Sequence, residues 1–238
     1  PILHPDFSDL VNEYGRKYNI SVLTSGYKVN QDAIKCLKNA TLGVTVSIYS
    51  SDAKKHDAFT GVNGSYTSIH DFLLSARENH IPVGVSTMLT TDNQSDIEQL
   101  IVTLENLGVT NISIGRIAPI GRASKGPVKD SIPSRKQFIS CVNHLGTQFP
   151  SVNIWSEDTQ FSSEYTSGFR CTAGSFIWAI YENGEIHPCA TCTTPELKIG
   201  DIAHFDDSIL HDRNTYENRI SRLPCMQLSD EHPCPFTD

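Results

Sequence analysis

Basic residues are scarce in this sequence. Its 238 residues include 19 Lys and Arg against 27 Asp and Glu, for a formal net charge of -8. Because a nucleic-acid interface needs a basic face for the phosphates, this balance argues against nucleic acid as a partner. The sequence also has no basic run to attract an anionic lipid surface, and no apolar stretch of about 20 residues to span a bilayer. We therefore expect no nucleic-acid partner and no membrane association.

Several familiar catalytic motifs are missing as well. There is no Gly-x-Ser-x-Gly elbow, no Walker loop and no Gly-x-Gly-x-x-Gly after a predicted strand, and the nine histidines are scattered. These absences argue against a hydrolase, a P-loop enzyme and a dinucleotide-binding domain. No signal-peptide pattern is present, so a cytoplasmic protein is expected. Pro1 is not a natural initiator residue, and we expect that a preceding segment was removed or left out.

The seven cysteines do not suggest a disulfide framework, because their number is odd and no secretion signal accompanies them. Cys36 and Cys141 lie in stretches typical of amphipathic helices and are expected to be ordinary core residues. The other five lie from Cys171 onward, and such a cluster in a cytosolic protein more often binds metal. They are Cys171, Cys189, Cys192, Cys225 and Cys234.

Most of the chain alternates between strand and helix patterns. Apolar runs predict strands at 20–24, 44–48, 83–89, 111–117 and 152–155. Helical spacing of apolar residues predicts helices at 7–17, 30–40, 65–79, 93–108 and 134–147, with Asn93 or Ser95 as the N-cap of the fourth. This alternation is typical of βαβ units and a parallel sheet. The pattern alone leaves open whether that sheet is closed into a barrel.

The character of the sequence changes near residue 164, where turn residues and cysteines replace the alternation. We place a domain boundary there, giving domains 1–164 and 165–238. Tyr181–Ile186 is predicted to be a β-hairpin, with Asn183-Gly184 as a type I′ turn. This hairpin leads directly into His187-Pro188-Cys189.

A series of short motifs resembles those of radical S-adenosylmethionine enzymes. Pro1 matches the proline of Gly-Gly-Glu-Pro, Thr24-Ser25-Gly26 matches Thr-Asn-Gly, and 46–50 matches Val-Ser-Ile-Asp-Gly without its Asp-Gly. Further matches follow in order: His56-Asp57, Thr60-Gly61 and Gly64-Ser65 for a loop and helix start, 82–93 for a strand and its asparagine, and 119–123 for Pro-x-Gly-Arg-Ala. The resemblance implies a partial (β/α)6 barrel that lacks its first unit. In the family this barrel holds a catalytic 4Fe-4S cluster and S-adenosylmethionine at the carboxyl ends of its strands.

The second domain resembles the SPASM or shorter twitch auxiliary cluster domain. Cys171-x12-Gly184-x4-Cys189 matches its opening, and 199–202 resembles the Ile-Gly-Asn-Ile that follows. The resemblance implies a small cysteine-rich α+β domain with one auxiliary 4Fe-4S cluster on Cys171, Cys189, Cys225 and Cys234. Leu228 and Asp238 replace two cysteines of the full C-x2-C-x5-C-x3-C motif, which argues against a second cluster. Cys192 has no family counterpart and is a ligand, a spare thiol or a buried residue.

The resemblance also implies a reaction. A reduced cluster would cleave S-adenosylmethionine to a 5′-deoxyadenosyl radical, which abstracts a hydrogen atom from the substrate. Ser47 and Ser86 are expected to hydrogen-bond the methionine carboxylate or ribose, and the backbone around Ile117 to meet the adenine. No catalytic residue is named by the sequence. A peptide or protein substrate and an electron donor such as flavodoxin or ferredoxin are expected. The family's C-x3-C-x2-C motif is not among these 238 residues, so this fragment is expected to be inactive.

Alternatives remain at this point. A small-molecule radical dehydrogenase uses the same cofactors. A non-catalytic iron–sulfur module, acting in electron transfer or peptide binding, would need only the second domain's cysteines. Cys189-x2-Cys192 with Cys225 and Cys234 could instead bind structural zinc, although that site leaves Cys171 unused.

Overall fold

A computed structural model describes residues 1–40, 42–117, 127–156, 177–190 and 195–205. The chain divides into two compact units, which are described separately. The first unit comprises Pro1–Ile117 and Gly126–Gln160, and the second comprises Ala118–Lys125 and Phe161–Asp238. The domain boundary expected after residue 164 lies outside the described residues and stays a prediction.

The first unit is built on a five-stranded parallel sheet in the order β1-β2-β3-β4-β5. Its strands are β1 (Val22–Thr24), β2 (Val44–Ser47), β3 (Val83–Leu89), β4 (Asn111–Arg116) and β5 (Asn153–Trp155). Each strand pairs with the next one along the chain, as successive βαβ units require. All five predicted strands are therefore confirmed, and the parallel sheet with them.

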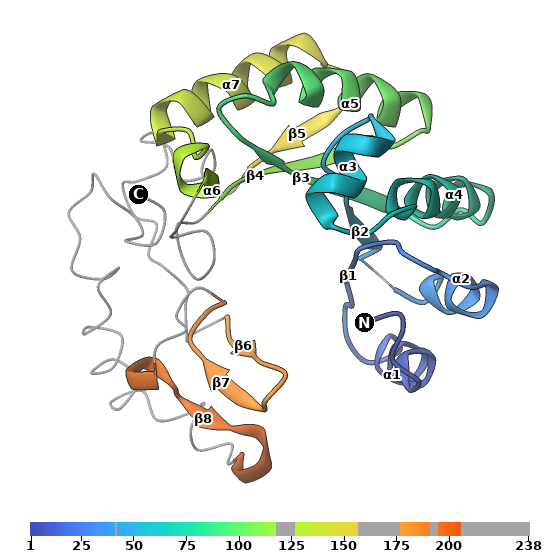
Figure 1. The fold of residues 1–238 in the computed structure, drawn as a ribbon. Helices are drawn as coiled ribbons and strands as arrows, with labels where there is room; N and C mark the ends of the chain where they lie inside the picture. Colours follow the sequence, from blue (N-terminus) through green and yellow to red (C-terminus); the bar gives the residue numbers. More distant parts are fainter. Residues whose placement is uncertain (41, 118–126, 157–176, 191–194, 206–238) are drawn as a thin grey trace. The chain divides into compact units, whose positions relative to one another are not determined.

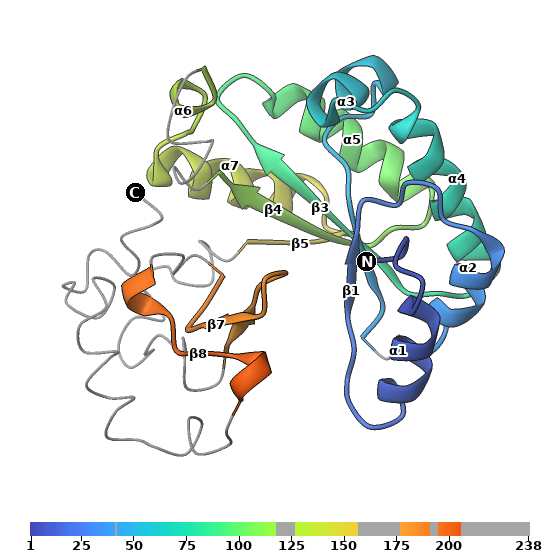
Figure 2. The same ribbon diagram turned by 60° about the horizontal axis from the view of Figure 1, so that its bottom comes forward.

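Helices lie before and between these strands in the sequence, and several of them cover one face of this sheet. They are α1 (Phe7–Tyr14), α2 (Gln31–Leu37), α3 (Ala53–Thr60), α4 (Ser65–Glu78), α5 (Gln94–Asn106), α6 (Pro127–Asp130) and α7 (Arg135–Gln148). Figure 1 and Figure 2 show α2, α4, α5 and α7 side by side along the same side of the strands. No described helix is long and apolar enough to cross a membrane.

Helix α3 was not predicted from the sequence, since a loop was expected there. Asp52 begins the helix by accepting hydrogen bonds from the N–H groups of Lys54 and Lys55, at 2.8 and 3.0 Å. Gly61 ends it in the left-handed conformation, at φ 71°. The only buried side chain of α3 is His56, so the helix leaves no apolar periodicity in the sequence.

The core lies between the sheet and these helices. Strand residues at alternate positions are buried there, among them Val46, Val85, Ile112 and Ile114, and they pack with helix residues such as Ile69 and Leu100 in one cluster. The intervening strand residues point to the opposite face of the sheet, because strand side chains alternate. We call that opposite face the inner face; it carries Thr45, Ser47, Ser86 and Ser113, all half-buried.

The second unit contains a three-stranded antiparallel sheet in the order β6-β7-β8. Its strands are β6 (Ala179–Ile180), β7 (Glu185–His187) and β8 (Gly200–Asp201), and the 3-10 helices η2 (Pro195–Leu197) and η3 (Ile202–His204) accompany them. The fold class predicted from the sequence is confirmed: a partial α/β barrel is followed in the sequence by a small antiparallel three-stranded sheet with short helices.

The predicted hairpin is present, but the predicted type I′ turn is wrong. The N–H of Gly184 donates to the carbonyl of Tyr181 at 2.9 Å, and Gly184 alone in this turn has a positive φ, 86°. The predicted type I′ turn needs positive φ at both of its central residues, Asn183 and Gly184, and Asn183 does not have it. The observed arrangement is a type I turn followed by a left-handed glycine, which also suits the Asn-Gly pair.

Candidate functional site

A row of hydroxyl groups crosses the inner face of the first unit. Ser47 of β2 pairs in register with Ser86 of β3, and Ser86 pairs with Ser113 of β4. Adjacent strands lie about 4.8 Å apart, so the three side chains occupy neighbouring positions in one row. The structure therefore brings the two predicted cofactor-binding serines together and adds Ser113, which the sequence analysis missed. Aligning the two-residue alternation of neighbouring strands would have found it.

The position beyond this row, toward the carboxyl ends of the strands, is also free of bulky branched side chains. Met88 pairs with Gly115 there. A Cβ atom added to Gly115 would lie 2.8 Å from the sulfur of Met88, so the thioether lies against the β4 backbone where a side chain would stand. The interior of a complete (β/α)8 barrel is filled mainly by Val, Ile and Leu. Serine and glycine stand at these positions instead, and the Met88 side chain lies beside Gly115.

The turn after β1 has the geometry that its glycine permits. The N–H of Gly26 donates to Thr24 Oγ1 at 3.2 Å, and Gly26 has a φ of 68°. A Cβ atom on Gly26 would lie 3.0 Å from Val46 Cγ1 and 3.1 Å from Ile69 Cγ1. Both the left-handed conformation and the close packing therefore favour glycine in the Thr24-Ser25-Gly26 motif.

The turn after β2 is held by a buried histidine. The N–H of Tyr49 donates to Nδ1 of His56 at 3.1 Å, and His56 is fully buried. The ring of His56 stacks on Tyr49 at 5.8 Å and meets Tyr66 edge-on at 5.9 Å. Burial lowers the pKa of His56 below its usual value, so the neutral imidazole is favoured. In that form Nδ1 accepts and Nε2 carries the proton; among the described residues Nε2 has no hydrogen-bond partner.

The neighbouring residue, Asp57, holds the start of α4. Its carboxylate accepts hydrogen bonds from the N–H groups of Gly64 and Tyr66, at 2.6 and 2.9 Å, and from the hydroxyl of Ser65 at 2.9 Å. The N–H of Tyr66 is the largest cause that lowers the pKa of Asp57, followed by Gly64 and the Ser65 hydroxyl. The His56-Asp57 and Gly64-Ser65 motifs are thus in contact, with His56 facing the end of β2 and Asp57 facing α4.

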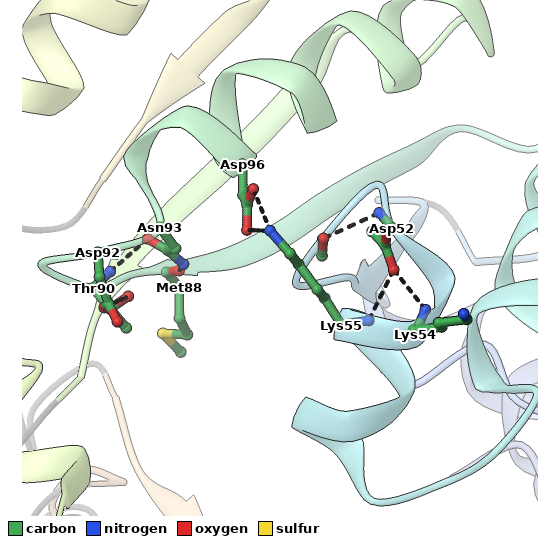
Figure 3. A network of polar contacts seen from close by, with 9 residues as sticks. Asp52, Lys54, Lys55, Met88, Thr90, Asp92, Asn93 and Asp96 are labelled. Carbon is green, nitrogen blue, oxygen red and sulfur yellow. Dashed lines mark hydrogen bonds and ion pairs between the residues drawn. The ribbon is translucent and has the colours of Figure 1, made fainter.

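The turn after β3 is closed by Asn93. Its Oδ1 accepts from the N–H of Thr90 at 2.8 Å, and its Nδ2 donates to the carbonyl of Met88 at 2.9 Å (Figure 3). Asn93 occupies the N-cap position of α5, but its side chain makes no capping hydrogen bond. The predicted N-cap position is therefore confirmed, but the expected capping hydrogen bond is not made. The amide of Asn93 instead bonds to backbone groups at the end of β3, which use both its donor and its acceptor.

The turns after β2 and β3 are joined by an ion pair. Lys55 Nζ of α3 lies 2.8 and 2.7 Å from the two carboxylate oxygens of Asp96, in the first turn of α5 (Figure 3). The hydrogen bond to Asp96 is the largest cause that raises the pKa of Lys55. The turns after β2 and β3 are thus each held by hydrogen bonds to their own strand end, and the Lys55–Asp96 ion pair links the helices that follow them.

Comparison with known proteins identifies the fold. No family model matches the sequence, and no curated protein matches it. Among solved structures, Streptococcus suis SuiB bound to the precursor peptide SuiA matches with a TM-score of 0.76 at 15% identity, covering 95% of this chain and 56% of that one. SuiB bound to S-adenosylmethionine gives a TM-score of 0.73 at 14% identity, covering 97% of this chain and 58% of that one. The anSMEcpe structure with AdoMet and the Kp18Cys peptide gives 0.67 at 11%, covering 95% of this chain and 69% of that one.

The chain has the fold of radical S-adenosylmethionine enzymes. It spans little more than half the length of the SuiB chains, 56 to 58%. The sequence resemblance and the structural comparison therefore agree, although the sequence identities are low enough that the comparison establishes only the fold.

Within this radical S-adenosylmethionine fold, Ile117 directly follows β4 and lies half-buried at the carboxyl end of that strand. Ser47 is the last residue of β2, so both predicted cofactor contacts belong to the same edge of the sheet. The motif 119–123 lies outside the described residues. Its expected place after β4 stays a prediction.

The predicted metal ligands are only partly within the described structure. Cys189 follows β7 by two residues and is half-buried. Cys171, Cys225 and Cys234 lie outside the described residues, as does Cys192, so their convergence with Cys189 stays a prediction. In the ranges that the structure describes, no group of three or more His, Cys, Asp or Glu residues could hold a metal ion.

The two cysteines expected in the core are found there. Cys36 is buried in α2, and Cys141 of α7 packs against the same cluster. Burial is the largest cause that raises the pKa of both thiols. A protonated thiol is a poor metal ligand, in agreement with a packing role.

The strand that leads to Cys189 is fixed by charged residues. Lys198 Nζ lies 2.9 Å from Glu185 Oε1 and 3.5 Å from Asp201 Oδ2, joining β7 to the neighbouring segment and β8. The buried His187 places Nε2 3.5 Å from Glu185 Oε2. The hydrogen bond from Lys198 is the largest cause that lowers the pKa of Glu185, to about 2. These contacts stabilise the hairpin that ends two residues before Cys189.

Proposed function

We propose that these residues belong to a radical S-adenosylmethionine enzyme that modifies a peptide or protein. The observation that carries the proposal is the registered pair of Ser47, the last residue of β2, and Ser86, within β3, in a sheet whose fold is shared with S-adenosylmethionine-bound SuiB. Ligands of parallel α/β folds bind at the carboxyl ends of the strands. The reaction is proposed for a protein that also carries the C-x3-C-x2-C motif, which is not among these 238 residues.

The residues of this chain bind and orient the cofactor in the proposal. The hydroxyls of Ser47 and Ser86 donate hydrogen bonds to the methionine carboxylate or accept them from the ribose. The backbone near Ile117 meets the adenine, at the end of β4. When bound, S-adenosylmethionine and a reduced 4Fe-4S cluster supply hydrogen-atom abstraction, while the protein supplies positioning and exclusion of water. An electron donor such as flavodoxin or ferredoxin provides the reducing electron.

The second unit is proposed to hold one auxiliary 4Fe-4S cluster on Cys171, Cys189, Cys225 and Cys234. The hairpin before Cys189 supports this, because β7, which precedes Cys189, pairs with β6, the first described strand after Cys171 in the sequence. A small unit with short strands also gains stability from a bound cluster. Anaerobically prepared protein should be brown, and Cys189→Ala should lose iron while Cys141→Ala retains it. Colourless protein that contains zinc would contradict the cluster.

The peptide substrate is proposed from the structural neighbours. SuiB was solved with a precursor peptide, and anSMEcpe with the Kp18Cys and Cp18Cys peptides. Each of these two matches covers 95% of this chain. A short precursor peptide encoded beside this gene would support the assignment, and neighbouring genes of sugar or alcohol metabolism would contradict it.

The cofactor site is tested by two serine variants. In the complete protein, Ser47→Ala and Ser86→Ala should each weaken S-adenosylmethionine binding by about 10- to 150-fold, because a hydrogen bond to a charged group contributes about 1.5–3 kcal/mol. Equilibrium dialysis with labelled S-adenosylmethionine measures the loss. Ser95→Ala, an exposed serine on α5, is the matched control and should bind normally. Unchanged binding in both site variants would contradict the proposed site.

A further inference from the structure

The unexpected helix α3 contacts the turn after β2 and the first turn of α5 through two adjacent residues. His56 accepts the N–H of Tyr49, which lies two residues after Ser47. Lys55, the residue before His56, binds both carboxylate oxygens of Asp96 on the neighbouring βα unit. One short helix thus holds the turn after its own strand and is tied to the turn after the next strand.

The turn after β3 repeats this arrangement. Met88 lies two residues after Ser86, and its carbonyl accepts a hydrogen bond from Asn93. Asn93 precedes α5 directly, and Asp96 is in the first turn of that helix. Each predicted cofactor serine is therefore followed, two residues later, by a backbone group that a side chain of the next segment holds.

The Lys55–Asp96 pair closes these contacts into a ring. Ser47 and Ser86 pair across the sheet, and the N–H of Ile48 donates to the carbonyl of Ser86 at 3.0 Å, so these paired positions of β2 and β3 form one side of the ring. The two turns form the adjacent sides. Lys55 and Asp96, which are 41 residues apart in sequence, form the fourth side (Figure 3).

We propose that Lys55 and Asp96 are positioning residues for the cofactor site: they hold the turns 49–52 and 90–93 at a fixed spacing beside Ser47 and Ser86. This inference rests on the proposed function, since the ligand at the edge is taken to be S-adenosylmethionine. Neither side chain acts on the ligand. They act through the backbone of the two turns, which the pair keeps together.

The charge pair is not expected to matter much for global stability. Lys55 and Asp96 have side chains that are 59% and 31% exposed, and exposed ion pairs contribute little to the free energy of unfolding. The same limit bounds the functional effect. Breaking the pair should weaken S-adenosylmethionine binding by about two- to fivefold, the range that the coupling of such a pair allows.

The test is a double-mutant cycle in the complete protein, with S-adenosylmethionine affinity as the readout. Lys55→Met keeps the aliphatic stem and removes the charge, and Asp96→Asn keeps the shape. Each single variant should lose about two- to fivefold in affinity, and the double variant should lose no more than either single, because both remove the same contact. Lys55→Arg should keep the affinity of the parent protein, since a guanidinium can bind both carboxylate oxygens of Asp96. Lys17→Met, which breaks an exposed pair with Glu13 on α1, is the control and should bind normally.

Amide hydrogen exchange supplies a second readout that does not depend on the cofactor. Residues 49–52 and 90–93 should exchange faster in Lys55→Met than in the parent protein, while the thermal midpoint shifts little. Normal affinity in both single variants, or additive losses in the double variant, would overturn the positioning role and leave the proposed function standing. A parent protein that binds no S-adenosylmethionine would overturn both.

Discussion

Replacing Gly26 by alanine tests how tightly the turn beside the cofactor edge is packed. Gly26 ends the Thr24-Ser25-Gly26 motif with a φ of 68°. The added methyl carbon would lie 3.0 Å from a γ-carbon of Val46 and 3.1 Å from a γ-carbon of Ile69, where ordinary contacts begin at about 3.4 Å. Both neighbours are almost completely buried, so neither can move into solvent.

The loss of stability has two parts. A left-handed conformation costs an alanine about 1–2 kcal/mol relative to glycine. Forcing a methyl group into a closely packed core costs about 1–3 kcal/mol more. We therefore expect Gly26→Ala to lose about 2–5 kcal/mol of the free energy of unfolding. Gly61→Ala is the matched control: its φ is 71°, but no atom lies within 4 Å of the added carbon, so only the first cost applies.

Urea unfolding of the two variants separates these parts. With a slope of about 3 kcal/mol per molar urea, Gly26→Ala should lower the unfolding midpoint by about 1 M and Gly61→Ala by about 0.5 M. The slopes should remain equal to that of the parent chain. Equal midpoint shifts in the two variants would refute the packing argument, because the contacts with Val46 and Ile69 would then cost nothing.

Two further predictions concern histidines. His80 ends α4 at φ 56° in a Schellman motif, with its own N–H bonded to Arg77 and that of Ile81 bonded to Ala76. His80→Gly should therefore raise stability by about 0.5–1 kcal/mol in thermal unfolding, and a lower midpoint would contradict the strain at this position. Burial lowers the pKa of His56, so the unfolded chain binds one more proton between the folded value and about 6.5. The contribution of His56 is fully present above about pH 6.5 and is lost as the pH falls toward the folded value. His56→Phe should have a smaller loss of stability between pH 7.5 and 5.5 than the parent, and an unchanged loss would contradict the assignment.

Periodic features of this fold could be predicted from the sequence. Apolar runs in the sequence identified the strands, and the helices between them followed from apolar spacing such as that of Ile69, Phe72 and Leu73 in α4. The same runs placed Ser47 and Ser86 on strands, and the family motifs suggested their role. Their exact pairing required the register, which is set by contacts between strands.

Features that depend on long-range contacts were not predictable. Helix α3 buries only His56 and is tied to the rest of the fold by a pair whose members are 41 residues apart. Asn93 has the propensity of an N-cap, but nearby backbone groups of the β3 end compete for its amide. The Asn183-Gly184 pair is compatible with two hairpin turns, and local sequence does not choose between them.

The central claim is that the complete protein uses S-adenosylmethionine as a radical source. Protein carrying the C-x3-C-x2-C motif would be reconstituted anaerobically with iron and sulfide, reduced with dithionite and incubated with S-adenosylmethionine. Chromatography should then show that 5′-deoxyadenosine accumulates over time when reductant is present and does not form without it. At a subsaturating concentration of S-adenosylmethionine, Ser47→Ala should form much less. No 5′-deoxyadenosine from protein whose clusters are fully reconstituted would contradict the account.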